Sequence, residues 1–200
     1  RNYQSVLAID PTHRLAFSQL AAYLTERGEW RQLVALLEAQ APRETSRSQR
    51  TAILRQLVEI ARDQLGDRAL ARRHLRGILK LHPEDLASLY ALADLATVEN
   101  DWEEVVEQLQ RLTELETRPA ALRDLFFRLA AVFEERLNDP KRAIANFNKV
   151  VTLDPEHLES LRRLSHLHQA AEDYKRALTA AQQLHDRDHD PERKVEHMLR

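Results

Sequence analysis

The chain has 200 residues, of which 43% are hydrophobic and 31% charged, so it carries enough apolar side chains to fold and is not a disordered polymer. Its 30 basic and 32 acidic residues give a formal net charge of −2, which provides no general attraction to nucleic acid or to anionic membranes. Cysteine is absent, which excludes disulfides and thiolate metal sites, and no apolar run approaches the roughly 20 residues of a membrane-spanning helix.

The placement of glycine and proline predicts an all-helical chain. Three glycines and seven prolines are too few turn residues for an all-β domain. Apolar residues recur at helical spacing between the prolines, as Phe17, Leu20 and Leu24 do. The prolines are expected to flank or begin helices: Pro11, Pro42, Pro83, Pro119, Pro140, Pro155 and Pro191. We therefore expect helices of roughly 12–20 residues joined by short connectors.

An internal repeat of 72 residues organises the chain. Asp10-Pro11, His82-Pro83 and Asp154-Pro155 are evenly spaced by this offset. The same offset places apolar positions on apolar positions: Phe17, Leu89 and Leu161; Leu20, Leu92 and Leu164; Trp30, Trp102 and Tyr174; Leu57 and Leu129; Ala71 and Ala143. Chance does not keep such a register over two periods, so the chain is predicted to be a repeat protein.

Each 72-residue unit divides into two helix pairs, one short and one long. The long pairs carry an added turn residue in Leu65-Gly66-Asp67 and in Leu137-Asn138-Asp139. We expect one segment with repeats at 11–42, 43–83, 84–116, 117–155 and 156–190, and a half repeat at 1–10 and at 191–200. The chain begins at Arg1, and neither end reads as a polar cap, so we expect an internal window of a longer solenoid.

The pair after Pro83 resembles the tetratricopeptide repeat family. Leu89, Leu92 and Ala93 stand at its first-helix positions, and Trp102 begins its second helix after a tight turn. The resemblance covers essentially the whole chain, although Leu89, Phe17 and Leu161 stand where the family prefers Trp. It implies an all-α fold, a right-handed α-solenoid of helix-turn-helix pairs. The alternation of short and long repeats is similar to that of very long tetratricopeptide proteins of some bacteria.

The resemblance implies that the first helix of each pair lines a concave groove that binds a partner. The expected groove residues are Arg55, Glu59, Arg62, Tyr90, Asp94, Phe127, Glu134, Arg162 and His166. Tyr90 and Phe127 are aromatic at positions outside the expected core, and aromatic side chains often anchor partners. The alternative is that a neighbouring repeat covers them, or that Phe127 pairs with Phe126. The basic and amide side chains with which some family members clamp a terminal carboxylate are missing from these positions.

Charge is unevenly distributed along the chain. Residues 43–80 contain ten basic and four acidic residues, whereas residues 84–116 contain ten acidic residues and Arg111. One interpretation is a bipolar surface that steers a charged partner. The other is that adjacent repeats attract each other while most of these side chains are solvated. Arg72, Arg73 and Arg76 are expected on the outer side of a second helix, which favours the second interpretation.

No pattern of catalytic or metal-binding residues stands out. His185 and His189 are four residues apart but lie at a helix end with no further ligands, so we expect no metal. Asp186, Asp188 and Asp190 begin like a calcium loop, but Pro191 and His197 stand where Gly and Glu are required. A phosphate-binding glycine loop and a nucleophile motif are also absent. We expect neither a cofactor nor enzymatic activity.

The sequence therefore favours a non-catalytic scaffold that binds a protein or peptide partner through the groove. The alternative is a structural spacer or regulatory arm of a larger enzyme or signalling protein. RNA binding is a third hypothesis, which the net charge of −2 and the acidic third pair disfavour. No small-molecule substrate and no membrane insertion are expected. Localisation is cytoplasmic by default.

Overall fold

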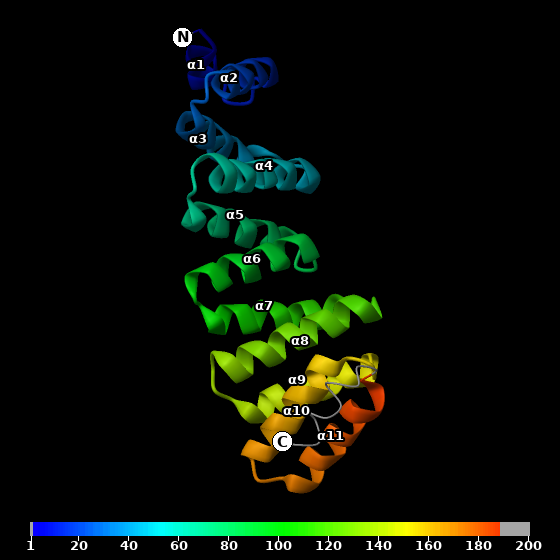
Figure 1. Ribbon diagram of the computed structural model, residues 1–200. Helices are drawn as coiled ribbons and strands as arrows, with labels where there is room; N and C mark the ends of the chain where they lie inside the picture. Colours follow the sequence, from blue (N-terminus) through cyan, green and yellow to red (C-terminus); the bar gives the residue numbers. More distant parts are fainter. Residues whose placement is uncertain (1, 189–200) are drawn as a thin grey trace. The chain divides into compact units, whose positions relative to one another are not determined.

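A computed structural model describes residues 2–188, and every regular element within this range is a helix (Figure 1). The residues group into two compact units, unit 1 (Arg1–Leu95) and unit 2 (Ala96–Arg200). The α-helices are α1 (Asn2–Ile9), α2 (Arg14–Glu26), α3 (Trp30–Gln40), α4 (Arg47–Glu59), α5 (Arg68–Leu81), α6 (Leu86–Glu99), α7 (Trp102–Leu115), α8 (Pro119–Glu135), α9 (Pro140–Leu153), α10 (Leu158–Ala170) and α11 (Tyr174–Arg187). The prediction of an all-helical fold is confirmed for residues 2–188.

Most helices that follow one another in sequence pack against one another. In unit 1, α1 packs on α2, α2 on α3, α3 on α4 and α4 on α5. In unit 2, the same holds from α7 to α11, with α9 in contact with both α8 and α10 (Figure 1). Contacts between sequence neighbours are the property of an α-solenoid, in which each pair completes the core of the next.

The buried side chains follow the 72-residue register. Leu57 and Leu129 are buried at equivalent positions, as are Ala71 and Ala143. The register also contains a departure, because Tyr174 stands in the place of Trp102 and its side chain is 67% exposed. Repeat periodicity therefore identifies the apolar stripe, whereas the first position of each second helix lies at the margin of the core.

The tight turns within the helix pairs share one backbone conformation. The residue before the N-cap of each second helix has a positive φ: Gly28, Gly66, Asn100, Asn138 and Glu172, at 50–66°. Glycine adopts this left-handed conformation freely and asparagine tolerates it, whereas a glutamate is strained there. Asp67, Asp101, Asp139 and Asp173 then cap the following helix by accepting a hydrogen bond from a backbone N–H three residues on.

The long pairs absorb their extra residue in a widened turn. In the short pairs the cap N–H reaches back five residues, as from Asp101 to the Ala96 carbonyl at 2.9 Å. In the long pairs it reaches back six, from Asp67 to Ala61 at 2.8 Å and from Asp139 to Phe133 at 2.7 Å. A π-helical turn over Ile60–Gln64 makes the extra room in unit 1. The two-pair alternation in the sequence is thus a difference in turn width.

Candidate functional site

On α4 and the π-turn that follows it, three of the expected groove residues lie on the exposed side. Arg55, Glu59 and Arg62 are exposed, and the apolar residues beside them are buried: Leu54, Leu57, Val58, Ile60 and Ala61. Arg62 donates to the carboxylate of Asp63 at 2.6 Å, which raises the pKa of the guanidinium and lowers the pKa of the carboxyl group. This face therefore presents fixed charges of both signs.

Arg55 also borders an open depression of about 780 Å³ in unit 1. The depression is lined by one face of α4 and by the connector to α6: Arg47, Ser48, Thr51, Ala52, Arg55, Leu81, His82, Pro83, Glu84 and Asp85. Its inner wall is held by a 3.0 Å hydrogen bond between the Thr51 hydroxyl and Nε2 of His82. Thr51 is buried, so this contact ties α4 to the connector.

Asp85 connects the depression to the start of α6. Its carboxylate accepts hydrogen bonds from the backbone N–H of Ser88 at 3.0 Å and from the Ser88 hydroxyl at 2.6 Å. It also accepts one from Arg55 at 2.8 Å, and the Arg55 side chain remains 57% exposed. Burial alone would raise the pKa of Asp85, but these bonds outweigh it and the pKa is lowered.

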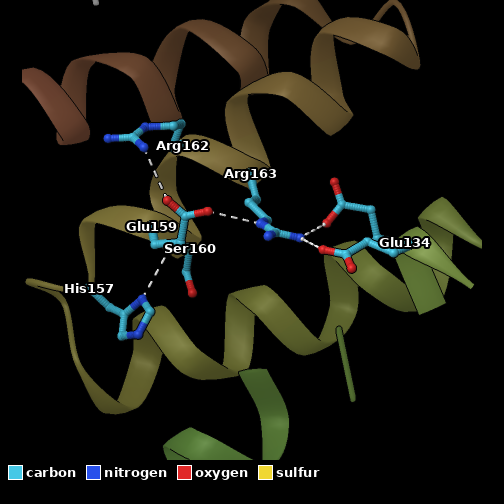
Figure 2. Close-up of polar contacts among 7 residues, drawn as sticks. Glu134, His157, Glu159, Ser160, Arg162 and Arg163 are labelled. Atoms are coloured by element: carbon cyan, nitrogen blue, oxygen red, sulfur yellow. Dashed lines mark hydrogen bonds and ion pairs between the residues drawn. The ribbon is translucent and has the colours of Figure 1, made fainter. Parts of the chain in front are cut away.

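In unit 2, Arg163 of α10 is the centre of an ion-pair network (Figure 2). Its guanidinium lies 2.8 Å from Glu134, 2.5 Å from Glu135 and 3.0 Å from Glu159. Burial would lower the pKa of Arg163, but hydrogen bonds to the three carboxylates raise it. Arg162 pairs with Glu159 at 3.2 Å on the same helix. The network connects α8 to α10, across the helix that separates them in sequence.

Phe127 of α8 packs inside unit 2 against two rings. Its centroid lies 5.7 Å from that of Phe147 and 5.1 Å from that of His157, and the side chain is half-buried. The Arg163 guanidinium lies 5.9 Å from the Phe127 centroid. His157 uses Nδ1 to accept the backbone N–H of Ser160 at 3.2 Å, which caps α10 (Figure 2). Phe127 is therefore a packing residue as well as a surface one.

The remaining expected residues lie on α6 and α10. Tyr90 is half-buried and Asp94 is exposed on α6, and His166 is exposed on α10. The structure brings Glu134, Phe127 and Arg162 to a common neighbourhood around Arg163, and Arg55 to the depression. It leaves Glu59, Arg62 and His166 as exposed side chains outside both sites. Each of these surfaces lies within one unit.

Two arginines of these surfaces, Arg163 and Arg47, were not among the expected groove residues. Arg163 follows Arg162 directly in the sequence, so an error of one residue in helical phase separates the half-buried Arg162 from the centre of the network. Arg47 lies at the start of α4, before the first residue of the apolar stripe. The repeat register marks Arg47 as a departure, because Pro119 stands 72 residues later and carries no charge.

Charges on neighbouring elements are partly paired within the molecule. Glu38 of α3 forms an ion pair with Arg73, and Nε2 of His74 lies 3.0 Å from the same carboxylate. Burial lowers the pKa of His74. Arg73 thus supports the interpretation in which adjacent elements attract each other.

Within residues 2–188, no group of three or more His, Asp or Glu side chains is arranged to hold a metal ion. Among the helices of this range, none combines the length and the apolar character needed to cross a bilayer. His189, Asp190, Pro191 and His197 of the metal-like patterns, and the half repeat at 191–200, lie outside the described residues.

Comparisons with known proteins agree with this architecture. A family model described as tetratricopeptide repeat matches residues 124–157, which contain most of α8 and all of α9. The comparison with curated protein sequences gives no match.

Solved structures share the fold at low sequence identity. A crystal structure of MamA is 14% identical with a TM-score of 0.54, over 88% of this chain and 96% of MamA. YrrB, described as a TPR protein with an unusual peptide-binding site, is 14% identical with a TM-score of 0.53, over 100% of this chain and 99% of YrrB. PilF of Pseudomonas aeruginosa is 17% identical with a TM-score of 0.50, over 92% of this chain and 80% of PilF.

Proposed function

We propose that this chain, which folds as a tetratricopeptide-repeat protein, is a non-catalytic scaffold that binds a protein or peptide partner on its first-helix faces. The observation that carries the proposal is the division of α4 into two sides. Leu54, Leu57 and Val58 are buried against the rest of unit 1, and the neighbouring Arg55 and Glu59 are exposed. A helix with one face in the core and a charged opposite face is suited to contact a second molecule.

The fold supports this proposal as an analogy. YrrB is a TPR protein with an unusual peptide-binding site, and its structure matches the full length of this chain. We extend peptide binding to this chain on the first helices of the repeats proposed at 43–83, 84–116, 117–155 and 156–190. The residues assigned to the binding faces are Arg55, Glu59, Arg62, Tyr90, Asp94, Phe127, Glu134, Arg162 and His166.

A second function, that of a structural spacer or regulatory arm, is favoured by one observation in unit 2. Arg163 is held by three carboxylates of its own unit, and Phe127 packs on Phe147 and His157. Side chains that are already engaged stiffen the stack of helices and offer less to a partner. A spacer would need this stiffness and would not need the exposed charges of α4.

Site-specific photocrosslinking separates these functions. A photoreactive residue is placed at Glu59 of α4 or at Lys80 of α5, both exposed in unit 1. In unit 2 the matched positions are His166 of α10 and Gln182 of α11. A groove-binding scaffold should crosslink the same partner from Glu59 or His166 and not from Lys80 or Gln182. Crosslinks confined to the second-helix positions would contradict the groove assignment, and no crosslink from any position would favour the spacer.

A further inference from the structure

We propose that the depression of unit 1 binds an extended acidic segment of a partner protein, with two carboxylates about four residues apart held by Arg47 and Arg55. The inference rests on the proposed function, because it names the chemistry of one binding face. It adds the class of ligand, the residues that recognise it and the spacing of the charges in the ligand.

Arg47 and Arg55 both have N–H groups that can donate hydrogen bonds to a ligand. Arg47 is exposed, and within residues 2–188 its guanidinium forms no hydrogen bond or ion pair. Arg55 gives one N–H to Asp85 at 2.8 Å and remains 57% exposed. A guanidinium has five N–H donors in a planar fork, so each of these arginines can still bind a carboxylate with two parallel hydrogen bonds.

The separation of the arginines defines the spacing of the ligand. Both lie on α4, eight residues apart, which corresponds to ~12 Å along the helix axis at ~1.5 Å per residue. An extended peptide rises ~3.3 Å per residue, and residues four apart point to the same side about 13 Å from each other. A separation of two residues spans only about 7 Å and one of six about 20 Å. Acidic residues at positions i and i+4 of an extended segment therefore match best.

The surface between the arginines permits close approach of a peptide backbone. Ser48 and Ala52 are exposed on the same wall of the depression, and both side chains are small. The Ser48 hydroxyl can donate to a peptide carbonyl. The inner wall is already fixed by the hydrogen bond between Thr51 and His82, so binding requires little ordering of the protein.

In unit 2, the positions equivalent to those that line the depression contact other residues of the same unit. Seventy-two residues after Arg47 and Arg55 stand Pro119 and Phe127, and neither side chain can bind a carboxylate. Phe127 packs its ring on His157, which corresponds to Asp85. Arg123 and Asp154 form a 3.2 Å ion pair in the place of Thr51 and His82. The arginine pair is thus a departure from the repeat, as expected of a position that serves a ligand.

The charges around the depression affect how tightly an acidic segment binds. Residues 43–80 carry ten basic and four acidic residues, which attracts an acidic segment. Glu84 and Asp85 oppose it, since both line the depression. Removal of the Asp85 charge should therefore strengthen binding. Asparagine is an N-cap as good as aspartate, so Asp85→Asn keeps the start of α6 intact.

The test is fluorescence anisotropy with labelled peptides at low ionic strength, using the whole chain. The first probe is a Ser/Thr/Gly peptide with two Glu residues four apart, the second has them two apart, and the third has Gln at both positions. We expect the first to bind most tightly. Arg47→Gln and Arg55→Gln should each weaken it about three- to fivefold, as expected of partly exposed charge pairs. Asp85→Asn should strengthen it about twofold.

The matched control is Arg68→Gln, which removes one exposed charge from the same positive segment but lies outside the depression. It should leave the affinity of the first peptide unchanged. Equal losses in Arg47→Gln and Arg68→Gln would overturn the site, because the attraction would then be general. Equal binding of the first and second peptides would overturn the spacing. Circular dichroism confirms that each variant is folded.

The outcome is separable from that of the scaffold proposal. A partner that crosslinks from Glu59 and is retained equally by the Arg47→Gln chain would overturn the acidic-segment inference and leave the scaffold standing. Peptide binding that depends on Arg47 and Arg55, with no crosslinked partner, would support the site and contradict the scaffold function.

Discussion

Units 1 and 2 hold different chemistry at the same pair of positions. In unit 1, Arg55 and Asp85 form a 2.8 Å ion pair beside an open depression. In unit 2, Phe127 and His157 bring their rings to 5.1 Å. The second residue of each pair also caps the next first helix, Asp85 through a carboxylate oxygen and His157 through Nδ1. The repeat thus conserves the capping contact and leaves the residue facing it free to serve either packing or recognition.

The largest expected effect is a loss of stability when the ring contacts of Phe127 in unit 2 are removed. Phe127→Ala removes the contacts with Phe147 and His157 and should lower the free energy of unfolding by about 2–3 kcal/mol, less than for a fully buried ring. Arg55→Ala loses a half-exposed ion pair and should cost less than about 1 kcal/mol. Urea unfolding measures both. Equal losses of stability in the two variants would show that Phe127 and Arg55 contribute equally to the fold.

The next effect concerns the turn of the long pairs. Gly66 has φ +61° and Asn138 has φ +50° at the equivalent position. Nothing lies within 4 Å of a Cβ placed on Gly66, so Gly66→Ala tests backbone strain alone and should cost about 1–2 kcal/mol. Asn138→Gly should be neutral or slightly stabilising. An equally destabilising Asn138→Gly would show that the Asn138 side chain matters more than its backbone.

Acid should weaken the cap that Asp85 provides at the start of α6. The pKa of Asp85 is lowered from 3.8 in the folded chain, so its contribution to stability is present above the unfolded value and is lost as the pH falls through the folded one. Urea unfolding from pH 6 downwards should therefore show a smaller acid loss in Asp85→Asn than in the parent chain. The difference should develop below about pH 4. Identical acid profiles would contradict the lowered pKa.

The smallest expected effect is a gain. Glu172 has φ +58° where the two earlier short pairs have Gly28 and Asn100. Glu172→Gly should relieve this strain and raise the midpoint of thermal unfolding by a few degrees, for a gain of about 0.5–1 kcal/mol. Glu172→Ala is the matched control, because it removes the side chain and keeps the strain. A similar gain in both variants would place the cause in the side chain.

The repeat register predicted the fold well because it rests on many positions at once. Leu57, Leu129 and Ala143 could each be assigned to the core from spacing alone, since burial of an apolar stripe is a local consequence of helical periodicity. The exposure of Arg55, Glu59 and Arg62 followed from the same periodicity.

The contacts of the candidate sites could not be predicted in this way. Phe127 meets His157 across thirty residues, and the outcome depends on which side chain a cap position carries. Three carboxylates surround Arg163 and not Arg162, because successive side chains on α10 point in directions that differ by about 100°. Arg47 lines the depression but stands outside the apolar pattern that defines the repeat.

The widened turn of the long pairs has a consequence for how this chain tolerates change. An extra residue inside an α-helix rotates everything after it by about 100° and would carry the apolar stripe out of the core. Here the extra residue is taken up between Ala61 and Asp67, and again between Phe133 and Asp139, where the cap N–H reaches six residues back. The helical phase on both sides is therefore independent of the turn. Loops of foreign sequence should be accepted at Gly66 or Asn138 more readily than at any point inside the helices they join.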